Sequence, residues 1–480
     1  MGEQRKHVIV VGGGVSGLSA AFYMQKLSAR HGNGLAITIV EENAQFGGKI
    51  KTLRKDNYII ERGPDSFLAR KTAVIDLTRE LGLENELVAT NPKAQKTYIL
   101  HKGKLHKMPA GLVLGIPTKV WPFVQTGLLS PLGKARAALD LVLPRRAGKE
   151  DESLGHFIER RLGTEVLAHI AEPLLAGIYA GETKSLSLMA TFPQFYAAEQ
   201  QHRSLILGML RGKTKSAAVP LPPSLPPAAQ KSMFLSYRQG LYTLVESLAM
   251  ALGGAGQIFG TSVLNIARKA DAYAVKLSDG QELYADAVVV AAPAFAAAKM
   301  LASIPGSGYL SQIPYVSVAN VVLGFAQSDI GVAMDGSGFV IPRTEGRTLT
   351  ACTWTSAKWL HTAPANKAVL RCYIGRAGAE VTGNLSDGEM IEKVRQEIKE
   401  IMGITEKPLF AEVSRWEHAM PQYPVGHLAR LAETRSAIRE AAPGIVLAGS
   451  GYNGVGIPDC IRQGKEAAER AVEFLYQAAK

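Results

Sequence analysis

A strand, a glycine-rich turn and a helix follow one another at the start of the chain, and this order most limits how it can fold. The apolar run 7–11 leads into a helix-forming stretch through the residues Gly12, Gly13, Gly14, Val15, Ser16 and Gly17. Gly12 permits a tight turn, Gly14 lets phosphates approach the backbone, and Gly17 lets the helix pack close to the strand. Because free N–H groups at the start of such a helix attract a diphosphate, the pattern predicts a dinucleotide-binding βαβ unit.

Acidic residues and a second glycine pair follow the next apolar run, 36–40. The run ends in Glu41 and Glu42, where an acidic side chain can accept hydrogen bonds from the ribose of an adenosine. Residues 45–49 then read Gln-Phe-Gly-Gly-Lys. A nicotinamide dinucleotide does not need another close backbone here, whereas the longer FAD does. The spacing therefore favours FAD over NAD.

A similar arrangement recurs near the other end of the chain. The apolar run 445–448 leads through a glycine-rich segment into a predicted helix at 457–476. The backbone N–H groups of Val455, Gly456 and Ile457, at the start of this helix, are suited to stabilise negative charge on a reduced flavin. We therefore expect two glycine-lined helix openings, one near each end of the chain, to converge on a single FAD.

Composition and charge limit the classes of partner. The 480 residues suffice for two or three packed units, and 47% hydrophobic and 20% charged residues are typical of a globular enzyme. The net charge of +12 is spread along the chain, which argues against nucleic acid. It indicates either an ordinary basic, solvated surface or attraction of a polyanionic substrate or an anionic membrane surface. The histidines and the three cysteines show no metal-ligand spacing, so we expect no metal. We expect no signal peptide and no transmembrane segment, and hence a cytoplasmic protein that is at most peripheral at a membrane.

The order of these patterns predicts the architecture. We expect an α/β fold with a Rossmann-like FAD-binding domain assembled from discontinuous segments, an antiparallel-sheet substrate domain and a helical domain. The predicted division is a first FAD-binding segment at 1–90, a mostly helical and substrate-lining region at 91–230, a second FAD-binding segment at 231–300, the antiparallel-sheet substrate domain at 301–415, and a third FAD-binding segment at 416–480. Hairpins are expected to turn at 56–57 and 102–103, and helix breaks are expected at Pro131, Pro144 and Pro173. The proline-rich stretch 211–230 is expected to be an exposed loop or a poorly ordered segment.

Further stretches carry a more specific resemblance: 59–71, 173–181, 189–193 and 454–459. With the glycine turns, they resemble the soluble bacterial oxygen-dependent coproporphyrinogen III oxidase and protoporphyrinogen oxidase family, within the flavin amine oxidase superfamily. The resemblance runs from Lys6 to the last helix and is weakest at 213–230. The family often has arginine where Gln45 and Lys49 stand here.

The resemblance implies an activity and its partners. The activity is an FAD-dependent, oxygen-using six-electron oxidation of coproporphyrinogen III to coproporphyrin III in haem biosynthesis, with release of hydrogen peroxide. Protoporphyrinogen IX is the alternative substrate, although a basic protein suits the more anionic coproporphyrinogen. The product is expected to pass to the next haem-pathway enzyme. The rivals are another flavin amine oxidase-like enzyme and a non-catalytic carrier of the same fold.

The resemblance also implies site residues. The expected FAD contacts are Gly12, Gly13, Gly14, Val15, Ser16, Gly17, Glu41, Glu42, Lys49, Gly63, Pro64, Asp65, Ser66, Val263, Trp416, Val455, Gly456 and Ile457. Arg70 and Lys71 are expected to pair with substrate carboxylates. No side-chain acid or base is identified from the sequence.

Overall fold

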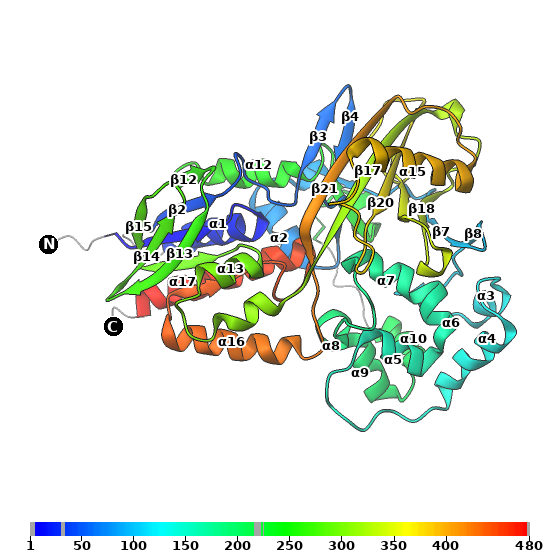
Figure 1. Ribbon diagram of the computed structural model, residues 1–480, viewed down its shortest axis with the longest axis horizontal. Helices are drawn as coiled ribbons and strands as arrows, with labels where there is room; N and C mark the ends of the chain where they lie inside the picture. The colour runs from blue at the N-terminus through cyan, green and yellow to red at the C-terminus, as the bar shows by residue number, and fades with distance from the viewer. Residues whose placement is uncertain (1–4, 30–33, 216–221, 224, 478–480) are drawn as a thin grey trace.

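The computed structural model describes residues 5–29, 34–215, 222–223 and 225–477. A parallel sheet with its helices lies at one end of the molecule, and a larger sheet and a group of helices lie at the other (Figure 1). The first described strand, β1 (His7–Val11), and the last described helix, α17 (Ile457–Gln477), lie together at the end with the parallel sheet (Figure 1).

The parallel sheet is built from distant segments of the chain. Its strands, in spatial order, are β12 (Gly256–Phe259), β2 (Ala36–Glu41), β1 (His7–Val11), β16 (Ala287–Val290) and β22 (Ile445–Leu447). All its pairings are parallel. The central strand β1 is apolar because both faces of the sheet are covered. The α/β fold assembled from discontinuous segments is thus confirmed.

Different elements cover the two faces of this sheet. Val8 and Val10 pack on one face with α1 (Val15–Ser28), α2 (Thr72–Glu80), α12 (Tyr242–Ala251) and α17 (Ile457–Gln477). Ile9 and Val11 pack on the other face with β13 (Val263–Lys269), β14 (Ala272–Leu277), β15 (Glu282–Ala285), α13 (Ala294–Met300) and α16 (His427–Ala441). The helices α1 and α17 touch closely, since a Cβ on Gly464 would overlap the carbonyl oxygen of Ser16.

The larger sheet has the spatial order β21 (Phe410–Pro421), β17 (Tyr315–Ala326), β20 (Lys367–Ile374), β19 (Leu349–Trp354), β18 (Gly336–Val340), β7 (Lys96–His101) and β8 (Lys104–Lys107). Its pairings are antiparallel except that of β18 with β7. The helix α15 (Asp387–Met402) packs on it. Strands β7 and β8 come from the region expected to be mostly helical, and β21 crosses residue 415, so the sheet extends beyond the range 301–415.

The helical region packs around its own core. It comprises α3 (Val120–Gln125), α4 (Pro131–Ala138), α5 (Leu154–Leu162), α6 (Thr164–Val166), α7 (Glu172–Tyr179), α8 (Leu188–Thr191), α9 (Pro193–His202) and α10 (Leu205–Lys215). Pro131 begins α4, and Pro144 lies outside the helices, as expected. The prediction of a helix break at Pro173 is wrong, because the chain stays helical there. A π-helical turn at Leu167–Ala171 runs directly into α7, and its shifted hydrogen bonding accommodates a residue that lacks an N–H group.

Smaller elements connect these regions. The hairpin of β3 (Thr52–Lys55) and β4 (Tyr58–Glu61) turns at 56–57, and the hairpin of β7 and β8 turns at 102–103, as expected. A further sheet joins β5 (Phe67–Leu68), β11 (Phe234–Tyr237) and β6 (Leu87–Ala89). The prediction that 211–230 forms no regular element is wrong at both ends of this range, because α10 runs to Lys215 and α11 spans Pro227–Lys231. Residues 216–221 and 224 lie outside the described residues.

Candidate functional site

The first glycine turn has the geometry that its pattern predicts. Gly12 has a φ of +101°, and its N–H donates to the carbonyl of Val40 at 2.8 Å. Gly14 precedes the first turn of α1, and a Cβ on Gly17 would overlap the carbonyl oxygen of Gly12. Gly12 and Gly17 require glycine, the first for its positive φ and the second because no space is left for a Cβ. The N-terminus of α1 therefore opens at the end of the central strand.

The second glycine pair lies directly against this turn. The N–H of Gly47 donates to the carbonyl of Gly13 at 2.9 Å. A Cβ on Gly48 would lie 3.2 Å from the Cα of Gly14, while a Cβ on Gly14 would meet nothing closer than the Cα of Gly48 at 4.0 Å. Two stretches of backbone without side chains therefore face each other beside the opening of α1.

A buried carboxylate marks the end of β2. Glu41 is 4% exposed and accepts hydrogen bonds from the N–H of Gly13 at 2.7 Å and from the backbone and side chain of Asn43 at 2.9 and 2.5 Å. A carboxylate offers about four acceptor positions, so Glu41 can accept a further donor such as a ribose hydroxyl. The segment before β13 lies alongside, since the N–H of Thr261 donates to the carbonyl of Glu41. Val263, which begins β13, is buried, whereas Glu42 is exposed.

The C-terminal glycine segment forms the second helix opening. Gly454 has a φ of +104°, and a Cβ there would lie 2.6 Å from the Cγ of Asp459. The hydroxyl of Tyr423 accepts from the N–H of Gly454 at 3.0 Å and donates to the carbonyl of Ser450 at 2.5 Å. Val455 and Gly456 lead into α17, which begins at Ile457. Asp459, in the first turn of α17, and Tyr423, in the loop after β21, therefore contact this opening.

Lys49 joins the two openings. Its Nζ donates to the carbonyl of Ala419 and lies 3.4 Å from Oγ of Ser450, beside the C-terminal opening. Burial lowers the pKa of Lys49 to about 8. Because α1 also packs along α17, the two glycine-lined openings expected from opposite ends of the chain do converge.

The segment 63–66 lies between the openings and the larger sheet. A Cβ on Gly63 would overlap the carbonyl oxygen of Lys49, and Nε1 of Trp416 donates to the carbonyl of Arg62 at 2.7 Å. Asp65 pairs with Lys358 at 2.9 Å and accepts from the hydroxyl of Ser66 at 2.6 Å. Burial alone would raise the pKa of Asp65, but the positive charges of Lys358 and Arg371 outweigh it and hold that pKa below its usual range.

The expected substrate residues lie beside the C-terminal opening. Lys71 precedes α2, and its Nζ pairs with Asp459 in the first turn of α17 at 2.6 Å. Arg70 is exposed and makes no ion pair with any residue in the described ranges. Lys71 therefore presents its charge next to Gly454.

The residues around the two openings have the features that binding of FAD requires. The bare backbones of Gly14 and Gly48, the spare acceptor position of Glu41 and the two adjacent helix N-termini fit a long dinucleotide with a diphosphate. No group of three or more histidine, cysteine or acidic residues among those described can hold a metal ion.

The family of flavin containing amine oxidoreductases matches residues 15–472. The chain belongs to this family. The strand, glycine turn and helix N-terminus fit a dinucleotide, and the flavin is FAD. As a member of the family, the chain is a flavin-dependent oxidoreductase.

Relatives within the family are similar over their whole length. The coproporphyrinogen III oxidase of Bacillus subtilis is 46% identical over 99% of this chain and 100% of its own length. That of Staphylococcus aureus is 38% identical over 98% and 100%. A solved structure from Exiguobacterium sp., named for protoporphyrinogen oxidase activity, has a TM-score of 0.86 and 37% identity, covering 98% of this chain and 99% of that one.

Some residues of the site have no local sequence signal. Asp459 lies within the stretch 454–459, but its pairing with Lys71 is not visible in the sequence. Tyr423, Lys358 and Arg371 come from elements of the larger sheet and its connections, where they stand among ordinary strand and helix residues. Only the fold brings them to the glycine segments.

Proposed function

We propose that the protein oxidises coproporphyrinogen III to coproporphyrin III in haem biosynthesis, with FAD as cofactor and molecular oxygen as electron acceptor. The observation that carries this proposal is the convergence of the two glycine-lined openings in a chain that matches named coproporphyrinogen III oxidases from end to end. The substrate loses six electrons and six protons in three rounds, and three molecules of oxygen become three of hydrogen peroxide.

The residues of this chain bind and orient rather than react. When bound, FAD supplies the two-electron oxidation of each round. Gly12–Gly17 and Glu41 would hold the diphosphate and ribose, and the segments 63–66 and 455–457 would hold the flavin portion. We include Glu42, Val263 and Trp416 among the proposed contacts, Val263 through its backbone. Lys71 and Arg70 would pair with substrate carboxylates, which fixes the porphyrinogen relative to the cofactor.

Charge favours coproporphyrinogen over the alternative, protoporphyrinogen IX. Coproporphyrinogen III carries four propionates and protoporphyrinogen IX carries two, and the protein has a net charge of +12. A clear preference for protoporphyrinogen in kcat/KM would reject this choice.

The proposal is tested by mixing the purified yellow enzyme with coproporphyrinogen III without oxygen. We expect the flavin absorbance to bleach, and to return with hydrogen peroxide when oxygen is admitted. Bleaching by polyamines and none by porphyrinogens would instead support an amine oxidase. A protein that retains no FAD would support a carrier.

Replacing Lys71 or Arg70 with alanine is expected to raise KM for coproporphyrinogen by about tenfold, because a charge-assisted contact is worth roughly 1.5–3 kcal/mol. FAD retention should change little, since neither side chain belongs to the glycine segments. Steady-state kinetics and bound-FAD absorbance measure the two effects. Unchanged KM in both variants would remove these residues from the substrate site.

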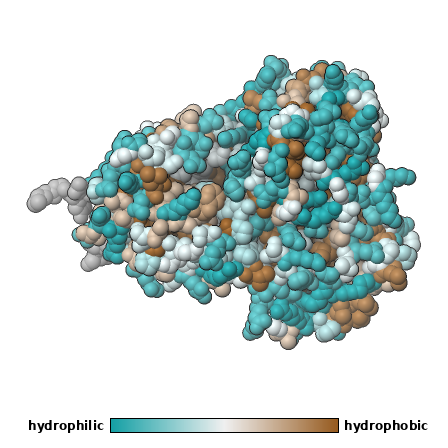
Figure 2. All heavy atoms as spheres, viewed as in Figure 1, coloured by the Kyte–Doolittle hydropathy of each residue, from teal (hydrophilic) through white to brown (hydrophobic). Residues whose placement is uncertain are grey.

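We also propose that the protein acts in the cytoplasm and contacts an anionic membrane surface. No helix within the described residues combines the length and apolar character needed to cross a bilayer. Trp121 on α3 and Leu132 on α4 are 69% and 82% exposed, and Figure 2 shows apolar atoms at the corner where these helices lie. Exposed Lys119 lies two residues before Trp121, and half-exposed Lys134 lies two residues after Leu132. Apolar side chains among lysines are typical of an interface with anionic lipid. Handover of the product to the next haem-pathway enzyme stays a prediction.

The double variant Trp121→Gln, Leu132→Gln is expected to bind vesicles of phosphatidylserine and phosphatidylcholine about tenfold more weakly than the wild type, because it buries less apolar surface. Co-sedimentation measures the binding. Leu360→Gln, at a 70% exposed position between β19 and β20 of the larger sheet, is the matched control and should bind normally. Equal binding by all three proteins, or none by the wild type, would contradict the proposal.

A further inference from the structure

Three side chains of the larger sheet hold the carbonyl groups of Arg62 and Gly63. Nε1 of Trp416 on β21 and Nδ2 of Asn320 on β17 donate to the carbonyl of Arg62 at 2.7 and 2.8 Å. Nη2 of Arg371 on β20 donates to the carbonyl of Gly63. These donors come from three neighbouring strands, so the segment that begins at Arg62 is bound to the sheet through its carbonyl oxygens.

The amide groups that follow are left without protein partners. Among the residues that the structure describes, no acceptor is bonded to the N–H of Gly63, Asp65 or Ser66. The side chain of Asp65 is engaged by Lys358 and by Nε1 of Trp359. The sheet therefore binds the carbonyls of Arg62 and Gly63, and the connection between β19 and β20 binds the carboxylate of Asp65. The N–H donors of this half-buried segment are left for another group.

Arg371 is unusual among these side chains because it is a buried charge without an ion-pair partner among the described residues. It is 4% exposed, and among the described residues no carboxylate lies within 4 Å of its guanidinium, whose Nε has no acceptor. The guanidinium packs 4.9 Å from the centre of the Tyr373 ring. Burying a charge with so few hydrogen bonds is costly, and an apolar residue would stabilise the strand better. Folding alone does not explain an arginine here.

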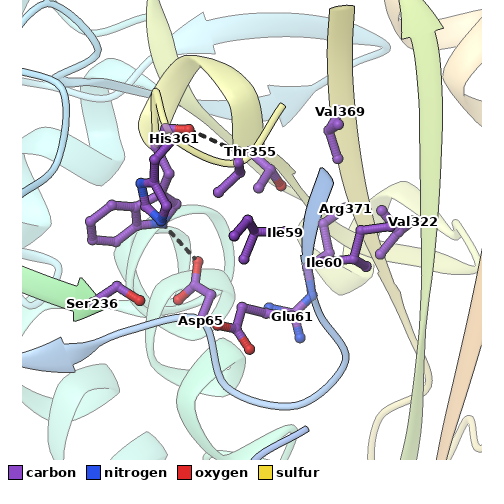
Figure 3. A pocket seen from close by; sticks show the side chains of 12 residues that line it. Ile59, Ile60, Glu61, Asp65, Ser236, Val322, Thr355, His361, Val369 and Arg371 are labelled. Atoms are coloured by element: carbon purple, nitrogen blue, oxygen red, sulfur yellow. Dashed lines mark hydrogen bonds between the residues drawn. The ribbon is translucent and has the colours of Figure 1, made fainter. Parts of the chain in front are cut away.

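The charged groups around Arg371 do not balance its positive charge (Figure 3). Figure 3 shows Glu61, Asp65 and Arg371 lining one small cavity. Lys358 compensates Asp65, and burial raises the pKa of Glu61 to about 7, so this carboxyl is largely uncharged below neutral pH. His361, which also lines the cavity, has a pKa lowered to about 4 by burial and is neutral. Arg371 thus places a positive charge directly behind Gly63.

We propose that Arg371 is a positioning residue for the cofactor. It fixes the segment 63–66 so that the free amide groups face the FAD, and its charge favours the addition of electrons there. This inference rests on the proposed function, because that function supplies the FAD contacts of Gly63, Asp65 and Ser66.

The test compares Arg371→Met and Arg371→Lys with the wild type. In Arg371→Met we expect FAD to bind the apoprotein about tenfold or more weakly, since a hydrogen bond from a charged group is lost. We also expect the midpoint potential of the bound flavin to become more negative, because the positive charge is gone. Arg371→Lys should keep the potential near that of the wild type while still binding FAD more weakly. Fluorescence titration and spectroelectrochemistry give the two readouts.

Arg415→Met is the matched control. Arg415 also lies in the larger sheet, on β21, but it binds Thr382, Leu385 and Asp387 at the start of α15. We expect it to lower thermal stability without moving the flavin potential. An unchanged potential and FAD affinity in both Arg371 variants would overturn the inference, as would an equal shift in Arg415→Met. A wild type that binds no FAD or does not bleach with coproporphyrinogen would instead overturn the proposed function.

Discussion

Replacing Gly63 with alanine is expected to abolish FAD retention. The added Cβ would overlap the carbonyl oxygen of Lys49 and lie 3.0 Å from its carbonyl carbon, so one of the two backbones must move. Lys49 and Gly63 are both among the residues expected to contact FAD. A displacement of about 1 Å in a positioning segment costs on the order of a hundredfold in function. The overlap should also lower the free energy of unfolding by about 1–3 kcal/mol.

Bound-FAD absorbance after gel filtration and chemical denaturation measure these two effects. Gly308→Ala is the matched control, because a Cβ at Gly308 meets no atom within 4 Å. It should bind FAD normally and unfold as the wild type does. If Gly63→Ala keeps its FAD with unchanged activity, the close contact between residues 49 and 63 does not define the cofactor site.

The features of the fold that depend on local patterns could be predicted. The order of strand, glycine turn and helix at 7–24 is a short-range signal, because the three elements follow one another directly in the sequence. The hairpins at 56–57 and 102–103 are similar, since left-handed turn residues reveal them. The pairing of the two distant glycine segments followed from cofactor chemistry, because one FAD needs contacts on both its halves.

The remaining features depend on contacts that no local pattern encodes. The pairing of Lys71 with Asp459 joins residues 388 positions apart. Arg371 lies in a strand between Leu370 and Cys372, and its role appears only when β20 packs beside Gly63. Pro173 stays helical because a π-turn precedes it, and a π-turn has no reliable sequence signature. Tertiary packing decides each of these cases.

The stability of the protein is expected to fall as the pH rises through the pKa of Glu61. This side chain is 8% exposed, and it accepts from the N–H of Leu241 at 2.6 Å and from the hydroxyl of Thr52 at 2.8 Å. Burial raises its pKa from 4.5 to about 7, although these hydrogen bonds and the charge of Arg371 act in the opposite direction. The folded protein therefore holds a proton that the unfolded chain releases between these two pKa values.

The sign of the effect follows from this difference in proton binding. The contribution of the protonated carboxyl is complete below pH 4.5 and is lost as the pH rises to about 7, a change on the order of 3 kcal/mol. Glu61→Gln mimics the protonated form, so the variant should resemble the wild type at pH 5 and exceed it in free energy of unfolding by up to about 3 kcal/mol at pH 8. Urea denaturation at both pH values measures this difference.

Glu246→Gln supplies the comparison for Glu61→Gln. Glu246 pairs with Arg54 at 2.7 Å on the surface, with 44% of its side chain exposed, so its replacement removes a carboxylate that solvent screens. Its difference from the wild type should be small and nearly the same at pH 5 and pH 8. If Glu61→Gln instead exceeds the wild type by the same large amount at pH 5 and pH 8, Glu61 is ionised at both pH values. The positive charge of Arg371 is then matched by Glu61 across the whole range, and the expected shift in flavin potential on removing Arg371 should shrink accordingly.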